Sequence, residues 1–150
     1  MPRSYCHLMY HIVFSTKQRE PWLRNEIRTR MHEYLGGIIR KHGGTALIVN
    51  GTLDHVHLLA NLRQDKSVSD VVCSTKSNSS GWVHRTFPEL AEFGWQAGYG
   101  AFTVSPSQLE RTRKYITRQA EHHKKLSFKE EFVALLKAHK IEYDERYLWD

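Results

Sequence analysis

The stretch TALIVNGTLDHVHLLANL, residues 45–62, decides the fold of this chain. Its halves, residues 45–51 and 55–62, are short and rich in aliphatic side chains, and a turn around Leu53-Asp54 separates them. Two such runs joined by a short turn predict a β-hairpin. Because residues two apart on a strand face the same side, the second half should turn its aliphatic side chains toward a core and its two histidines away from it.

Helical and strand-like segments flank this hairpin on both sides. Aromatic and β-branched residues indicate strands, three- and four-residue apolar spacing indicates helices, and Ser-containing capping motifs mark helix starts. In chain order we expect a strand at 7–15, a helix at 23–42, the hairpin, a helix from Ser67 to about 86, a strand at 95–104, a helix from Ser105 to about 124, a helix from Ser127 and an aromatic tail at 141–150.

The order of these elements is β-α-β-β-α-β followed by helices. It predicts an α+β fold of the ferredoxin-like type (split βαβ, RRM-like), in which an antiparallel sheet carries helices on one face and C-terminal helices follow. We expect one domain over residues 1–150, with a core at about 5–125 and a C-terminal helix and tail at about 126–150. RNA-binding modules share this fold, so the fold alone does not decide the function.

The composition points to a polyanionic partner. The chain of 150 residues carries 22 Lys and Arg against 16 Asp and Glu, a formal net charge of +6. Such an excess favours nucleic acid, although a merely basic soluble protein fits the charge as well. Neither a signal peptide nor a membrane-length apolar run is visible, so we expect a cytoplasmic protein without a membrane partner. Cys6 and Cys73 are expected to be reduced and to fill the core.

The sequence Asp54-His55-Val56-His57 carries the clearest chemical signal. On a strand, His55 and His57 project two imidazoles to the same side, and two parallel imidazoles suit a divalent cation. A half-exposed strand with two incidental histidines explains the pattern equally well. The pair is therefore a candidate metal site rather than an established one.

A second candidate is Tyr115 with Gln119, on the helix expected after the fourth strand. Residues four apart share one helical face. Gln119 can offer a carbonyl oxygen to a metal, and Tyr115 can offer a phenol oxygen as a nucleophile. An amphipathic helix with a packed tyrosine fits these two residues too. The surrounding segment 110–125 carries a local excess of positive charge, which suits phosphates.

These motifs together resemble the single-tyrosine HUH transposases, the TnpA-like enzymes of small insertion sequences and their REP-associated relatives. His55-Val-His57 matches the His-hydrophobe-His motif of that family, and Tyr115 with Gln119 matches its nucleophile and third metal ligand. Segments 10–15 and 98–105 are similar to the strands that precede these motifs in the family. The ending at 142–149 and the His122-His123 pair look like the REP-associated branch.

The resemblance implies a mechanism and a substrate. A Mg²⁺ or Mn²⁺ ion held by His55, His57 and Gln119 would polarise a scissile phosphate. Tyr115 would attack it in single-stranded DNA and form a 5′-phosphotyrosine. The family also implies DNA hairpins as recognition elements and a homodimer, with no small-molecule cofactor. The sequence leaves open whether the tyrosine helix serves its own subunit or its partner's.

Several residues are assigned weaker roles. Asp54 is a candidate for orienting a histidine, although a turn residue would look the same. His122 and His123 can lie near Gln119, or they can be helix C-terminal cations favoured by the macrodipole. Positive side chains that can contact DNA, or simply be solvated, are Arg85, Arg111, Arg113, Lys114 and Arg118.

Three other functions compete with the transposase. An inactive or domesticated relative would bind nucleic-acid hairpins without cutting them, and it would not need His55, His57, Tyr115 and Gln119 together. A replication initiator or relaxase of the HUH class would tend to be larger. A metal-dependent hydrolase would activate water at the histidines and use Tyr115 only structurally.

Overall fold

A four-stranded antiparallel sheet forms the centre of the molecule. The computed structural model describes residues 4–149. The strands are β1 (Met9–Ser15), β2 (Thr45–Gly51), β3 (His55–Asn61) and β4 (Gly100–Thr103), in the spatial order β2-β3-β1-β4. This is the strand order of the expected ferredoxin-like fold, which the structure confirms.

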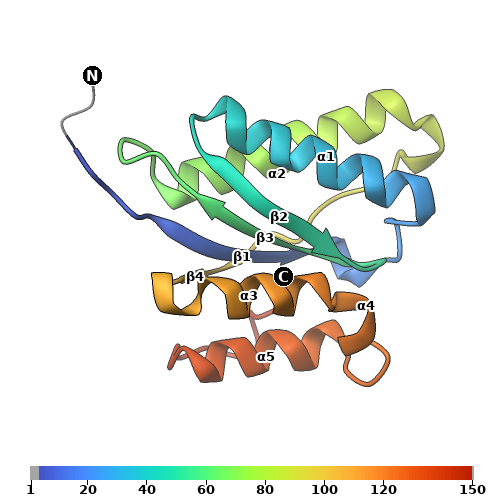
Figure 1. Ribbon diagram of the computed structural model, residues 1–150. Helices are drawn as coiled ribbons and strands as arrows, with labels where there is room; N and C mark the ends of the chain where they lie inside the picture. The colour runs from blue at the N-terminus through green and yellow to red at the C-terminus, as the bar shows by residue number, and fades with distance from the viewer. Residues whose placement is uncertain (1–3, 150) are drawn as a thin grey trace.

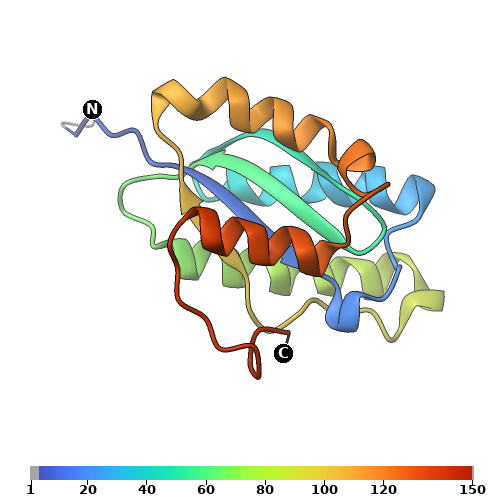
Figure 2. The same ribbon diagram turned by 90° about the horizontal axis from the view of Figure 1, so that it is seen from below.

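Helices cover both faces of this sheet. One face packs against α1 (Asn25–Lys41) and α2 (Val68–Thr86), and the other carries α3 (Leu109–Thr117), α4 (Gln119–His122) and α5 (Phe128–Ala138), as Figure 1 and Figure 2 show. Three short 3-10 turns lie at Lys17–Arg19, Pro88–Leu90 and Pro106–Gln108. The C-terminal helices therefore lie on the sheet face opposite α1 and α2. Among residues 4–149, no helix is long and apolar enough to cross a membrane.

The strand register divides the sheet into two chemically different faces. Ile12 lies opposite Leu58, and both side chains are buried in the core beneath α1 and α2. The next pair along the strand, Val13 opposite His57, faces the C-terminal helices. Because successive side chains alternate between faces, one register places aliphatic residues on one side and the histidines on the other.

Side-chain caps define where two of the helices begin. The Ser67 hydroxyl accepts a hydrogen bond from the backbone N–H of Asp70 at the start of α2. Ser127 and Glu130 form a reciprocal capping box at the start of α5. Such caps satisfy backbone donors that the first helical turn leaves free, so the helix starts expected at these serines follow from local chemistry.

The fourth strand is shorter than the expected strand at 95–104. Only Gly100–Thr103 pairs as a strand, and Trp95 makes a single bridge to Thr16. The reason lies in Lys76, whose ammonium group donates to the backbone carbonyls of Gln96, at 2.8 Å, and Gly98. These carbonyls point to a helix instead of a neighbouring strand, so the ladder cannot start before residue 100.

The expected continuous helix from Ser105 to about 124 is also interrupted. Ser105 makes no side-chain cap and precedes a 3-10 turn, and Arg118 leaves helical geometry between α3 and α4. The side-chain amide of Asn50 donates to the carbonyls of Ile116, at 2.9 Å, and Thr117. These bonds satisfy carbonyls at the end of α3 and fix the break above β2.

The expectation that both cysteines fill the core is wrong. Cys6 and Cys73 are free and exposed. Cys6 precedes β1, outside the sheet, and Cys73 lies on the outer side of α2, whose buried positions are instead filled by residues such as Val71, Val72 and Thr75.

Candidate metal and tyrosine site

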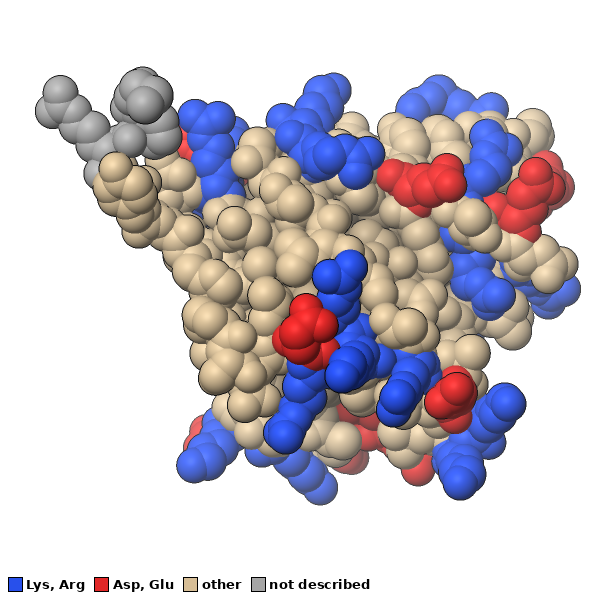
Figure 3. All heavy atoms as spheres, in the orientation of Figure 1, with Lys and Arg blue, Asp and Glu red and all other residues tan. Residues whose placement is uncertain are grey.

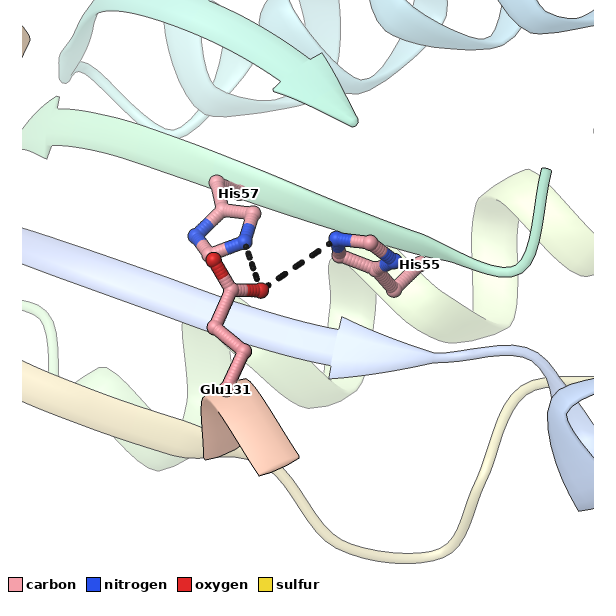
Figure 4. Close-up of side chains that lie close together, drawn as sticks. All are labelled: His55, His57 and Glu131. Carbon is pink, nitrogen blue, oxygen red and sulfur yellow. Dashed lines mark hydrogen bonds and ion pairs between the residues drawn. The ribbon is translucent and has the colours of Figure 1, made fainter. Parts of the chain in front are cut away.

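His55 and His57 stand side by side on the face of β3 that is covered by the C-terminal helices. Both are fully buried, and a carboxylate from α5 reaches them (Figure 4). The Glu131 Oε1 atom lies 3.0 Å from Nε2 of His57 and 3.4 Å from Nε2 of His55. These three side chains form a cluster whose donor atoms can share one metal ion.

Gln119 adds a further candidate metal donor from the C-terminal helices. It is fully buried at the start of α4, and its Oε1 lies 2.8 Å from Nε2 of His55. Its amide nitrogen donates to Oε2 of Glu131 at 3.0 Å. The hydrogen bonds from Asn50 that hold the end of α3 therefore also place Gln119 against the histidines.

Tyr115 projects from α3 toward the same carboxylate. Its hydroxyl donates to Oε2 of Glu131, and the ring of His122 stacks on the tyrosine ring at a centroid distance of 4.5 Å. Burial, and then the hydrogen bond and negative charge of Glu131, raise the pKa of Tyr115. The phenol is thus held in its protonated form, close to the candidate metal donors.

Glu131 lies at the centre of the cluster. Its carboxylate also lies 3.0 Å from Nε2 of His123. Burial alone would raise the pKa of Glu131, but hydrogen bonds from His123, His57 and Tyr115 hold it well below its usual range. The same carboxylate raises the pKa of His123 against the lowering effect of burial. A charged carboxylate is therefore kept at the centre of a buried site.

Each candidate ligand histidine has an outer partner on its Nδ1 atom. Asp54 Oδ1 lies 2.8 Å from Nδ1 of His55, the position required for the orienting role predicted from sequence. His11 Nε2 lies 2.7 Å from Nδ1 of His57. Burial, followed by the nearby charge of His57, lowers the pKa of His11 to about 3, and burial lowers that of His57 to about 4. The rings of His11 and His57 are therefore neutral near pH 7.

The hydrogen bonding of His55 fits a cation in the site. Its Nδ1 faces Asp54 and its Nε2 faces the amide oxygen of Gln119, so both nitrogens face acceptors. An imidazole that binds a metal through Nε2 keeps one N–H on Nδ1, which can donate to Asp54, while the Gln119 oxygen can bind the same ion. Neighbouring ligands on a metal with bonds near 2.1 Å lie about 3 Å apart, which is the spacing seen between these donor atoms.

Sequence reasoning missed Glu131 and His11. Glu131 lies on the apolar stripe of α5, between the buried residues Phe128 and Phe132. A carboxylate on an apolar helix face is costly unless it is paired, and that conflict is the signal that identifies it. His11 lies on the same face of β1 as Val13, and Val13 pairs with His57. The proximity of His11 to His57 becomes apparent only once the register of β1 and β3 is known.

The candidate DNA-contacting side chains separate into two regions. Arg111, Arg113, Lys114 and Arg118 are exposed on or next to α3, above the site. Figure 3 shows Lys and Arg side chains gathered over the C-terminal helices. Arg85 is exposed near the end of α2, on the opposite face of the sheet. The α3 group and Arg85 therefore lie on opposite sides of the sheet.

The chain resembles known transposases over most of its length. Residues 4–119 match the family model described as IS200-like transposase. The ISDra2 transposase TnpA of Deinococcus radiodurans is 28% identical over 123 residues, covering 78% of this chain and 88% of the relative.

Two solved structures are similar to this one. A protein described as a candidate transposase from Deinococcus radiodurans R1 has a TM-score of 0.66 and 25% identity, over 79% of this chain and 95% of the other. A REP-associated tyrosine transposase bound to a REP hairpin has a TM-score of 0.61 and 15% identity, over 82% and 73% of the two chains, and supports the fold alone. With the family match extending from residue 4 to Gln119, this chain belongs to the IS200-like transposase family.

Proposed function

We propose that this protein cleaves and rejoins single-stranded DNA in a metal-dependent reaction, with Tyr115 as the nucleophile. The observation that carries the proposal is the position of the Tyr115 hydroxyl, which shares the Glu131 carboxylate with His57 and Gln119. A nucleophile and a cluster of metal donors thus lie within one buried site. This arrangement suits phosphoryl transfer from DNA to an amino-acid side chain.

The chain offers four donors for a divalent ion, Mg²⁺ or Mn²⁺. His55, His57 and Gln119 are the ligands implied by the family, and Glu131 adds a carboxylate oxygen. When bound there, the ion supplies Lewis-acid polarisation of the scissile phosphate and offsets its developing charge. Asp54 and His11 hold the two imidazoles with their Nε2 atoms turned into the site.

The reaction of Tyr115 is a transesterification. Its phenol oxygen forms a bond to phosphorus while the bond between phosphorus and the 3′ oxygen breaks. Glu131 accepts the hydrogen bond that orients the phenol, the phenol proton passes to water, and the departing 3′ oxygen takes a proton from water. The products are a 5′-phosphotyrosine and a 3′-hydroxyl. Attack by a 3′-hydroxyl on the phosphotyrosine reverses the step, so rejoining needs no ATP.

The pKa values explain why this reaction should depend on metal. The pKa of Tyr115 is raised and that of Glu131 is lowered, so the proton stays on the phenol in the metal-free protein. Positive charge held by the neighbouring donor atoms lowers the pKa of Tyr115 and favours the phenolate. Without such charge, we expect no cleavage at neutral pH.

Hairpin-containing single-stranded DNA is the proposed substrate. The solved relative bound to a REP hairpin, the net charge of +6 and the exposed arginines on α3 support this choice. One chain brings both histidines, Gln119 and Tyr115 together, which supports a site completed within a single subunit. We propose a homodimer that acts in the cytoplasm, where DNA is available.

The proposal is tested by cleavage of labelled DNA hairpins taken from the regions beside the gene. The protein is incubated with each hairpin in Mn²⁺, Mg²⁺ or EDTA, and denaturing gels report covalent protein–DNA adducts. We expect adducts with either metal, none in EDTA and none for Tyr115→Phe. The matched control is Tyr34→Phe, because Tyr34 lies on α1, on the other side of the sheet.

Two outcomes would contradict the proposal. Cleavage that persists in Tyr115→Phe would assign the reaction to water activated at the histidines. Specific hairpin binding with no adduct under any metal condition would favour a hairpin-binding protein that has lost catalysis.

A further inference from the structure

A pocket of about 520 Å³ opens between α3 and α5, directly beside the tyrosine. Tyr115 and His11 form part of its wall, and Arg111 contributes a positive charge. Ligand pockets of small molecules span roughly 300–1,000 Å³, so this space can hold a single nucleotide. The cluster of metal donors does not line it, and the pocket is therefore a separate compartment next to the nucleophile.

His11 supplies an unused polar atom to this pocket. The residue is only 4% exposed, and it forms part of the pocket wall. Its Nε2 atom is committed to His57, which leaves Nδ1 for a ligand. The tautomers of His57 and His11 decide whether this Nδ1 carries a proton or a lone pair. In either form the pocket is offered a polar atom that can form a hydrogen bond with a nucleobase.

The remaining walls suit a flat, partly apolar ligand with a phosphate. Val104, Leu135 and Ala138 provide apolar surface, and the rings of Tyr115 and His139 provide aromatic surface. Bases bind single-strand proteins by resting on such surfaces, while a nearby cation holds the phosphate. Arg111 is exposed on α3 and can pair with a phosphate at the mouth of the pocket.

We propose that this pocket receives one unpaired nucleotide of the cleaved strand, the one next to the scissile phosphate. Its base lies against the apolar wall and forms a hydrogen bond with Nδ1 of His11, and its phosphate pairs with Arg111. This inference rests on the proposed function, because Tyr115 at the pocket wall defines where the scissile phosphate must lie. Occupation of the pocket would position the strand for attack and give the enzyme a base preference at that position.

Binding of a short oligonucleotide without cleavage tests the pocket. The probe is a fluorescein-labelled oligothymidine heptamer with 2-aminopurine at its centre, titrated into the full chain in EDTA. We expect its 2-aminopurine emission to change on binding, and an otherwise identical probe with a central abasic site to bind at least about fivefold more weakly. Fluorescence anisotropy gives the dissociation constants, and circular dichroism confirms that each variant is folded.

The pocket is then blocked with Ala138→Trp, which adds bulk at an exposed position of α5. We expect at least about fivefold weaker binding and loss of the emission change. The matched control is Ala134→Trp, one turn earlier on the same helix, also exposed and absent from the pocket wall, which should bind within twofold of the wild type. Arg111→Gln should weaken binding more than Lys137→Gln, an exposed charge of α5 outside the pocket.

Three results would overturn the inference: wild-type affinity and emission change in Ala138→Trp, equal affinity of the abasic probe, or equal losses for Arg111→Gln and Lys137→Gln. Each of these can occur while the wild-type protein still forms an adduct with hairpin DNA, so the pocket can fail without the proposed function. A protein that forms no adduct but shows the expected variant pattern would fail the proposed function alone.

Discussion

The two faces of the sheet are built on the same strands but have opposite chemistry. Beneath α1 and α2, side chains such as Phe14, Val56 and Leu58 form a continuous apolar core. Beneath α3 to α5, apolar residues occupy two smaller clusters, and His11, His55, His57, Gln119 and Glu131 are buried beside them. Burial of polar groups costs free energy unless they are hydrogen-bonded, and even then contributes little to stability.

This difference indicates that the apolar face supplies most of the stability and that the second face holds the candidate site. An apolar replacement of a buried charged cluster is often neutral or stabilising, so stability alone does not call for five buried polar groups on the second face. The cluster instead orients donors and a phenol around Glu131. If the comparison is right, changes on the two faces should affect different measurements.

The largest stability effect is expected on the apolar face. Leu58→Ala removes a fully buried side chain from the core beneath the helices and should cost about 2–5 kcal/mol of unfolding free energy. Urea unfolding in EDTA measures this loss. The Mn²⁺ affinity of the folded fraction should stay within about twofold of the wild type, and a much larger loss of affinity would mean that the two faces are not independent.

Removal of a candidate ligand should have the converse effect. His55→Ala should lower Mn²⁺ affinity by more than about a hundredfold, since loss of an outer partner alone costs 10- to 100-fold. Isothermal titration calorimetry on the metal-free protein measures it. The control is His32→Ala, a half-buried histidine on α1, which should leave the affinity unchanged. Equal affinities of wild type and His55→Ala would rule out this site.

A smaller effect is expected from the outer partner of His55. Asp54→Asn keeps the shape of the side chain but weakens the hydrogen bond that orients the imidazole, so Mn²⁺ affinity should fall about tenfold. Asp70→Asn, at the start of α2, serves as the control because it changes the same charge far from the site. If both variants lose affinity equally, the effect is one of overall charge and not of orientation.

The pH dependence of stability should report the buried neutral histidines. An unfolded histidine binds a proton near pH 6.5, whereas the pKa of buried His57 is lowered to about 4. The unfolded chain therefore takes up more protons as the pH falls from 6.5 to 4, and the free energy of unfolding decreases. His11 acts in the same direction. The raised pKa of His123 stabilises the folded chain fully below pH 6.5, and this contribution is lost only as the pH rises above 6.5.

Urea midpoints measured in EDTA between pH 7 and 4.5 test this prediction. Each histidine should contribute a slope of up to about 1.4 kcal/mol per pH unit within its window. His57→Gln removes a buried histidine from the site face and should make the unfolding free energy less dependent on pH. His32→Gln should have the same effect independently, because burial also lowers the pKa of His32 to about 4. A midpoint that does not move over this range would contradict the buried neutral state of these rings.

Most of the fold could be predicted from local patterns. The hairpin at 45–62, the first helix and the capped helix starts at Ser67 and Ser127 depend on neighbouring residues, and the structure contains them. The shortened fourth strand and the break at Arg118 depend on Lys76 and Asn50, which are distant in sequence. Such long-range hydrogen bonds leave no periodic signal, so sequence reasoning could not find them.

The candidate site was only partly visible for the same reason. His55 and His57 share one face of β3, and Tyr115 and Gln119 were expected on one helical face although they lie on α3 and α4, so residue spacing identified both pairs. Glu131 and His11 join the site from other elements through the packing of α5 and the register of β1. The assignments of function to all these residues remain predictions until they are tested chemically.

The most direct test is to map which residue carries DNA after reaction. The adduct formed with Mn²⁺ and a cleavable hairpin is digested with nuclease and trypsin, and mass spectrometry locates the nucleotide. Trypsin cuts after Lys114 and Arg118, so the predicted result is a nucleotide-bearing peptide Tyr115-Ile-Thr-Arg118 that is absent when EDTA replaces Mn²⁺. A nucleotide on any other tyrosine, or a Tyr115 adduct of equal yield in EDTA, would contradict a metal-dependent tyrosine site on this face of the sheet.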